Sequence, residues 1–222
     1  NYAFAYTGLA DMTFPTGVEA IGYKSFAYCA GYPETIHLPD SLTQIGGYVF
    51  DTSDTTSGVK KLSVSSIDVL LNLNRYYADT NPFIYINGQE APELIVPEGT
   101  KIIKEYSLSK IAGLKKVALP DSVEEIEANA FYGNEGLIEC NCPANLKKIG
   151  KDAFGDCSIR DIVIPVGVEI EAGAYGPTNL DGLPQNIYVF GNGDLSVLLP
   201  YASDNSYTIS NIFIGKNAAV SR

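Results

Sequence analysis

The chain has 222 residues, of which 45 % are hydrophobic and only 18 % are charged, so it can bury a sizeable core over one or two domains. Its 26 acidic and 15 basic residues give a net charge of −11, which argues against binding of nucleic acid or anionic lipid through a general positive field. No run of about eighteen apolar residues occurs, so the sequence predicts no membrane-spanning helix.

A repeat of about 23 residues runs along the chain. The first residues match the middle of later units, because Ala3-Phe4 corresponds to Ala130-Phe131, and we expect the array to start within a repeat. From there each unit has an apolar lead-in that ends in a proline. The prolines of this pattern are Pro15, Pro39, Pro97, Pro120, Pro143 and Pro165, the last four spaced by 23, 23 and 22 residues. A fixed period of this length predicts stacked supersecondary units.

Each unit predicts a short strand, a turn and a returning arm. The lead-in alternates, as in Val117-Ala118-Leu119, which is typical of a strand with one buried face, and the proline ends the strand because it has no N–H. A large apolar residue recurs eleven positions after the proline, as Phe26, Phe50, Leu108, Phe131 and Phe154. We expect this column to stack as a continuous core, with a short helical turn near each Ala-Phe.

Two regions depart from the period. Residues 66–90 are expected to form one irregular, longer repeat, and residues 177–222 to form divergent C-terminal repeats or a cap. The prediction is therefore a single array over residues 1–222. Its fold class is a repeat solenoid: a leucine-rich-repeat-like right-handed stack with a parallel inner sheet, mainly β with short helical turns.

The repeat resembles the BspA-like (Treponema-type) leucine-rich repeats of bacterial cell-surface proteins. The resemblance rests on Val117-Ala118-Leu119-Pro120-Asp121-Ser122-Val123, followed by Glu125-Ile126-Glu127-Ala128-Asn129-Ala130-Phe131, and on a second copy at residues 146–154. It covers nearly the whole chain and fades after about Gly176. The resemblance implies a role in cell-surface adhesion and leaves the ligand open.

Few residues suggest catalysis or metal binding. His37 is the only histidine, and no Gly-x-Ser-x-Gly motif accompanies it, so we interpret it as an exposed strand residue. Cys140 and Cys142 lie two apart on a predicted strand, about 6.5–7 Å from each other, at or beyond disulfide reach. Together with Cys157 they lack a fourth zinc ligand. We expect four free thiols, no metal, no cofactor and no enzymatic activity.

The outward positions of the predicted sheet remain as candidates for binding. They lie two residues before each proline, or at the equivalent place, and the candidates are His37, Ile95, Asn141, Val163, Tyr188 and Phe213. This column becomes apolar and aromatic toward the C-terminus. It forms either a recognition strip or a surface that the chain's own end covers.

These observations predict a non-enzymatic binding module that is displayed on the cell surface or secreted. Its expected partner is a protein or glycan on a host or neighbouring cell, recognised through the solenoid surface. The alternative is a structural spacer that displays another domain. The first residues lack the charged region of a secretion signal, so we expect any signal or anchor to lie upstream.

Overall fold

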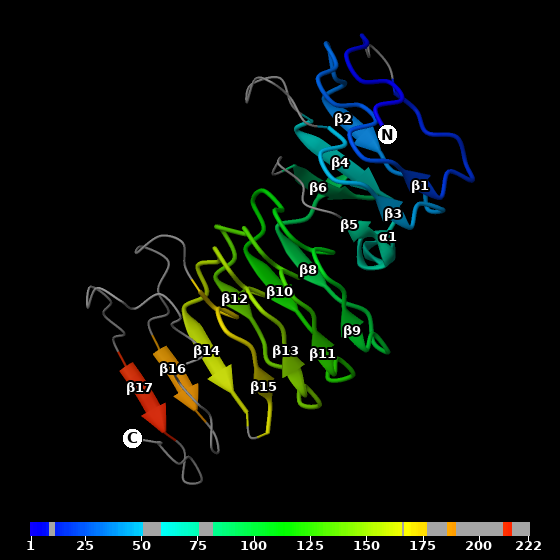
Figure 1. The fold of residues 1–222 in the computed structure, drawn as a ribbon. Coiled ribbons are helices and arrows are strands. Elements are labelled where there is room, and N and C mark those ends of the chain that lie inside the picture. The colour runs from blue at the N-terminus through cyan, green and yellow to red at the C-terminus, as the bar shows by residue number, and fades with distance from the viewer. Residues whose placement is uncertain are drawn as a thin grey trace, which may run out of the picture.

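The computed structural model describes residues 1–8, 12–50, 59–75, 82–165, 167–176, 186–189 and 211–214. Over these residues the chain winds through short stacked strands, and β1 (Ala20–Ile21) and β17 (Asn211–Ile214) lie at opposite ends of the stack (Figure 1). The helix found among the described residues, α1 (Ile67–Asn72), is six residues long. The predicted repeat solenoid of mainly β structure is confirmed.

One face of the solenoid carries the strands that lead into the prolines, and we call it the proline face. Its strands form three sheets, in the orders β2-β4-β6-β7, β8-β10-β12 and β14-β16-β17. Their bounds are β2 (Thr35–His37), β4 (Lys61–Val64), β6 (Phe83–Ile86), β7 (Gln89–Glu90), β8 (Glu93–Ile95), β10 (Lys116–Ala118), β12 (Glu139–Cys140), β14 (Asp161–Ile164) and β16 (Asn186–Val189). The predicted alternation holds in β8, where Leu94 is buried between two exposed neighbours.

A second face, which we call the isoleucine face, carries two-residue strands that return across the core. They form the parallel sheets β1-β3-β5 and β9-β11-β13-β15. Their bounds are β3 (Gln44–Ile45), β5 (Asn74–Arg75), β9 (Ile102–Ile103), β11 (Glu125–Ile126), β13 (Lys148–Ile149) and β15 (Glu169–Ile170). The register places Ile103, Ile126 and Ile149 next to one another, and all three are buried. Stacking therefore buries what a single coil would expose.

The predicted aromatic column forms the centre of the core. Phe131 stacks on Phe154 and Phe154 on Tyr175, with ring centroids 4.9 and 5.0 Å apart, close to the roughly 4.8 Å spacing of neighbouring strands. Phe26 stacks on Phe50 in the same way, at 6.1 Å. Each buried side chain of this kind contributes about 1.5–3 kcal/mol. The column prediction is confirmed.

The third side of each coil, which we call the turn edge, contains the residues around the core aromatic. Alternate backbone N–H groups there donate along the stack, so that Phe131 N donates to Ala153 O at 2.8 Å and Gly133 N to Gly155 O at 2.8 Å. The same ladder joins Phe4 N to Ser25 O at 2.8 Å. The backbone polar groups of this edge are thereby satisfied without a regular strand.

The turn edge differs from the helical turn expected from the sequence. Residues two before and two after the core position take left-handed backbone conformations, with φ from 48° to 76°. They are Tyr2, Tyr6, Lys24, Tyr28, Tyr48, Tyr106, Lys110, Asn129, Gly133, Asp152, Asp156 and Gly173. A right-handed helical turn would direct its N–H groups within one coil, whereas this conformation directs them to the next coil.

A side chain three residues after the core aromatic ties each coil to the one before it. Asn134 is buried, and its Nδ2 donates to Leu108 O at 2.8 Å while its Oδ1 accepts from Ile111 N at 2.7 Å. At the same position Cys157 Sγ donates to Phe131 O at 3.2 Å, and Cys29 Sγ to Phe4 O at 3.0 Å. These cysteines therefore act as weak hydrogen-bond donors within the core.

The parallel stack is interrupted within residues 66–90. After β6 the chain turns back through Asn87 and Gly88, with φ of 50° and 76°, into the antiparallel strand β7. Asn-Gly is a strongly preferred pair for a tight hairpin turn. Because β7 is antiparallel, the ladder of β2, β4 and β6 does not continue into β8. We call residues 1–75 the first block and residues 91–176 the second block; Figure 1 shows them as blue-to-teal and green-to-yellow runs of strands.

Candidate binding surfaces

The six residues predicted for the binding surface are distributed over all three sheets of the proline face. His37 is exposed on β2, where it pairs with Ser63. Ile95 is 76 % exposed on β8, in register with Ala118. Because β2 and β8 belong to different sheets, the structure does not bring these two residues into one column. The parallel inner sheet of the prediction is therefore present as three shorter sheets.

The side chain of Asn141 makes two hydrogen bonds to the backbone of the preceding coil. Its Oδ1 accepts from Leu119 N at 2.7 Å, and its Nδ2 donates to Leu119 O at 2.8 Å. The side chain thus supplies the pair of hydrogen bonds that the backbone ladder loses where β12 ends at Cys140. Asn141 is exposed as well as hydrogen-bonded to the neighbouring coil, and its place on a binding surface stays a prediction.

Val163, Tyr188 and Phe213 are brought together as the sequence predicts. The register of β14, β16 and β17 places these three residues side by side. Val163 and Tyr188 are half-buried. The side chain of Phe213, and the remainder of residues 177–222 outside β16 and β17, lie outside the described part of the chain. The recognition strip and the cap both stay predictions.

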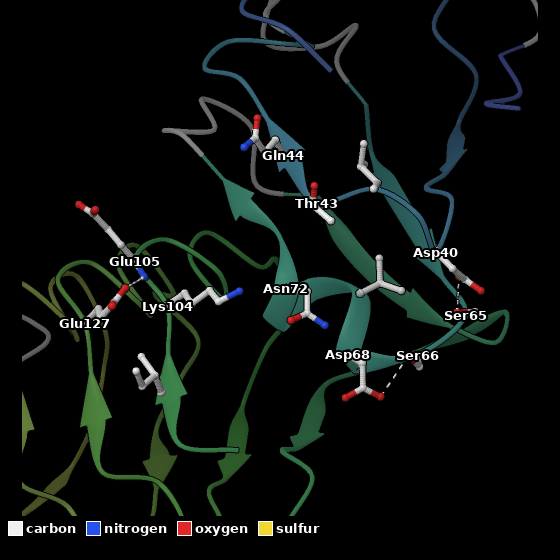
Figure 2. Close-up of a pocket in the computed structure, with 13 residues that line it drawn as sticks. Asp40, Thr43, Gln44, Ser65, Ser66, Asp68, Asn72, Lys104, Glu105 and Glu127 are labelled. Carbon is white, nitrogen blue, oxygen red and sulfur yellow. Dashed lines mark hydrogen bonds between the residues drawn. The ribbon is translucent and has the colours of Figure 1, made fainter. Parts of the chain in front are cut away.

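A polar cleft separates the two blocks on the side of the isoleucine face. It has a volume of about 730 Å³, within the range of small-molecule sites. The first block contributes residues around β3 and α1, including Thr43, Gln44, Ser65, Asp68 and Asn72. Figure 2 shows them opposite residues of the second block that follow β9 and β11. Its further polar lining residues are Asp40, Ser66, Lys104, Glu105 and Glu127.

Hydrogen bonds hold several of these side chains at the rim. Ser65 Oγ donates to Asp40 Oδ1 at 2.5 Å, and the backbone N of Glu105 donates to Glu127 Oε2 at 2.7 Å. Lys104 extends from the end of β9 toward Asn72 (Figure 2). Asp40, Asp68 and Glu105 are exposed. The cleft therefore presents four carboxylates and one ammonium, which favours uncharged or basic hydrogen-bonding groups over anions.

The cleft could not be assembled from the sequence. Its two walls come from residues 40–72 and 102–127, and they meet only because the hairpin interrupts the stack. The sequence signal that points to it is the lapse of the repeat after residue 65. Regular stacking would have placed another coil in this space.

The four cysteines carry free thiols. Burial raises the pKa of the Cys140 and Cys157 thiols, and raises the pKa of Cys142 to about 11. These three thiols are thus protonated near neutral pH and unreactive as nucleophiles. Among the described residues, no group of three or more His, Cys, Asp or Glu side chains is arranged to hold a metal ion. Within that same part of the chain, no helix is long and apolar enough to cross a membrane.

Comparison with known proteins gives a family and a fold. The sequence pattern described as BspA type Leucine rich repeat region matches in six copies, over residues 1–70 and 81–181. No curated protein matches the sequence. A crystal structure of a leucine rich cell surface protein from Faecalibacterium prausnitzii is similar with a TM-score of 0.54 and 18 % identity over 97 % of this chain. This chain spans 60 % of the length of that protein.

Two further solved structures share a weaker likeness. A leucine-rich repeat protein from Bacteroides ovatus has a TM-score of 0.41 and 19 % identity, and the match covers 89 % of this chain and 64 % of the other chain. Pneumococcal vaccine antigen PcpA has a TM-score of 0.37 and 17 % identity, and the match covers 89 % of this chain and 71 % of the other chain. At such identities the likeness concerns the fold alone.

Proposed function

The chain belongs to the BspA-type leucine-rich repeat family, and we propose that it is a non-enzymatic binding module, displayed on the cell surface or secreted, that recognises a protein or glycan. The observation that carries this proposal is the polar cleft between the blocks. It offers hydroxyl, amide, carboxylate and ammonium groups in a space of about 730 Å³. Such convergent hydrogen-bonding groups are what a ligand site needs for orientation and specificity.

The charge of the cleft selects among ligands. With Asp40, Asp68, Glu105 and Glu127 against Lys104, the formal balance is negative, as it is for the whole chain at −11. A neutral sugar or a protein segment with a basic side chain is compatible with this field, whereas a phosphorylated or sulfated ligand is disfavoured.

The test is a binding screen of the purified chain on an array of defined glycans and on a panel of purified host extracellular proteins. For a binder that the cleft recognises, Lys104→Ala and Asp68→Asn should weaken binding at least tenfold. The matched controls are Lys115→Ala and Glu98→Gln, which remove the same charges from exposed sites outside the cleft. Absence of a binder on both panels, or equal binding by cleft and control variants, would contradict the proposal.

A structural spacer is the second candidate. The observation that favours it is the hydrogen-bond ladder on the turn edge, which adds to the sheets on the other two faces and makes a stiff scaffold. A catalytic or adhesive domain attached to this array in the complete gene product, together with a chain that binds nothing by itself, would favour this role.

A further inference from the structure

The turn edge of the first block carries a row of tyrosine rings in two columns, which we call the tyrosine edge: Tyr2, Tyr23 and Tyr48 in one column, and Tyr6 and Tyr28 in the other. Tyr23 is 40 % exposed and Tyr28 and Tyr48 are half-buried, whereas Tyr6 at 75 % and Tyr2 at 51 % belong to the first coil of this sequence, in which the core residue Phe4 is also 53 % exposed. The row follows the axis of the stack over three coils, because Tyr6 lies on Tyr28 with centroids 5.1 Å apart and Tyr23 contacts both Tyr2 and Tyr48, at 6.0 and 5.9 Å.

Lys24 holds three of these rings. Its ammonium lies over the rings of Tyr23, Tyr28 and Tyr48, at 5.7, 5.3 and 5.1 Å from their centroids, and its Nζ donates to the Tyr28 hydroxyl at 3.2 Å. Rings held by cation–π and edge contacts lose little further freedom when a ligand binds. The tyrosine edge is therefore an ordered surface before any ligand arrives.

The fold does not require tyrosine at these positions. Tyr2, Tyr6, Tyr28 and Tyr48 have φ of 54° to 61°, a left-handed conformation that disfavours large side chains and favours Gly, Asn and Asp. Later coils have those residues at the equivalent positions: Asn129, Gly133, Asp152, Asp156 and Gly173. Backbone strain of this kind is concentrated at functional sites. The tyrosines therefore occupy these positions against the backbone preference.

From these observations we infer that the tyrosine edge is a binding site for an uncharged, linear polysaccharide. Aromatic faces pack against the apolar C–H faces of sugar rings, while phenol hydroxyls bond the sugar hydroxyls. Lys24 is the only lysine or arginine in residues 1–50, and the chain carries a net charge of −11, so a polyanion is repelled. A row of rings that repeats with the coils suits an extended polymer with its own repeat. The site is separate from the cleft.

The test uses affinity electrophoresis of the whole chain in native gels that contain a β-glucan, a xylan or a mannan, with heparin and polygalacturonate as charged comparators. At least one neutral polymer should retard the chain. The Tyr28→Asn/Tyr48→Asn double variant should bind it at least tenfold more weakly, because asparagine suits the left-handed backbone at both positions and removes the rings. The matched control Tyr106→Asn, at the equivalent position of a second-block coil, should bind like the unaltered chain.

Three results would overturn the inference: no retardation by any of the three neutral polymers, retardation by the polyanions only, or equal binding by the double variant. Thermal unfolding of each variant shows whether the fold is kept. Binding that Lys104→Ala abolishes and the double variant leaves intact would overturn the tyrosine-edge site and retain the proposed function of the cleft.

Discussion

The first block and the later coils of the second block stack in the same way but have different residues on the turn edge, while Tyr106 and Lys110 in the first coil of the second block resemble those of the first block. Both stack aromatic rings in the core, at 6.1 Å for Phe26 with Phe50 and 4.9 Å for Phe131 with Phe154, and both use left-handed residues to connect the coils. In the first block those residues are tyrosines and Lys24, whereas from Asn129 onward they are Asn, Asp and Gly. The stacking of coils thus imposes a left-handed backbone on residues that do not prefer it, and their side chains form part of the solenoid surface.

The largest loss of stability is expected for a substitution in the aromatic core. Phe131 is fully buried, so Phe131→Ala should lower the free energy of unfolding by about 3–5 kcal/mol because it leaves a cavity between two coils. Phe4 is 53 % exposed, and Phe4→Ala should cost clearly less. Urea unfolding followed by circular dichroism measures both.

The control for this pair is Lys116→Ala. Lys116 makes a 2.6 Å ion pair with Glu139 on the partly exposed proline face, and such pairs contribute about 0–1 kcal/mol. Equal losses for Phe131→Ala and Lys116→Ala would contradict the stacked aromatic column.

The next effect concerns the position three residues after the core aromatic, where the first block has Cys29 and the second has Asn134 and Cys157. Asn134→Ala should cost about 1–3 kcal/mol, because it leaves Ile111 N and Leu108 O without their buried partner. Asn134→Cys should cost less, since a thiol already serves this position in other coils. Thermal unfolding of the two variants measures the difference. Equal unfolding midpoints for the cysteine and alanine variants would contradict this role of the side chain.

The sequence was sufficient to predict the columns of the core. Ile126 and Phe131 recur at fixed offsets from a proline, and each offset returns to the same side of a coil, so the period alone identifies the buried positions. The same reasoning identified the outward strand positions, of which Ile95 is 76 % exposed.

Other features depended on interactions that a period does not encode. The left-handed residue Lys24 donates its backbone N–H to Gly47 O of the neighbouring coil at 3.0 Å, and nothing in its own side chain predicts that conformation. Asn141 turns its amide to the backbone of Leu119, 22 residues away, while it stays exposed. The cleft exists only because of the hairpin after β6, and its walls are far apart in the sequence.

A smaller effect concerns the pH dependence of stability, which Glu124 in the second block and Lys24 in the first block change in opposite directions. In the second block Glu124 Oε1 and Oε2 accept from Lys101 and Lys147 at 2.8 and 2.5 Å, and these hydrogen bonds lower the pKa of Glu124 to about 2. A lowered carboxyl pKa stabilises the fold above the unfolded value near 4.5, and this stabilisation is lost as the pH falls toward 2. Glu124→Gln should remove this part of the acid dependence.

Lys24 in the first block has the opposite sign. The hydrogen bond to Tyr28, followed by the charges of nearby phenols, raises the pKa of Lys24 above its usual 10.5. A raised lysine pKa stabilises the fold below that value, and this stabilisation is lost as the pH rises beyond it. Lys24→Met should therefore flatten the alkaline side of a plot of unfolding midpoint against pH, and Glu124→Gln the acid side. Both groups are at the surface, so high salt should reduce both effects. An alkaline change for Glu124→Gln, or an acid change for Lys24→Met, would contradict these assignments.

The smallest expected effect bears most directly on the central claim, that the tyrosines of the first block are held at the turn edge for the surface and not for the fold. The measurement is the free energy of unfolding of Tyr6→Asn. Tyr6 is 75 % exposed with φ of 61°, so asparagine should leave stability unchanged or raise it slightly. A loss of more than about 1 kcal/mol, the size of an ordinary destabilising substitution, would show that the ring supports the fold and would contradict the claim.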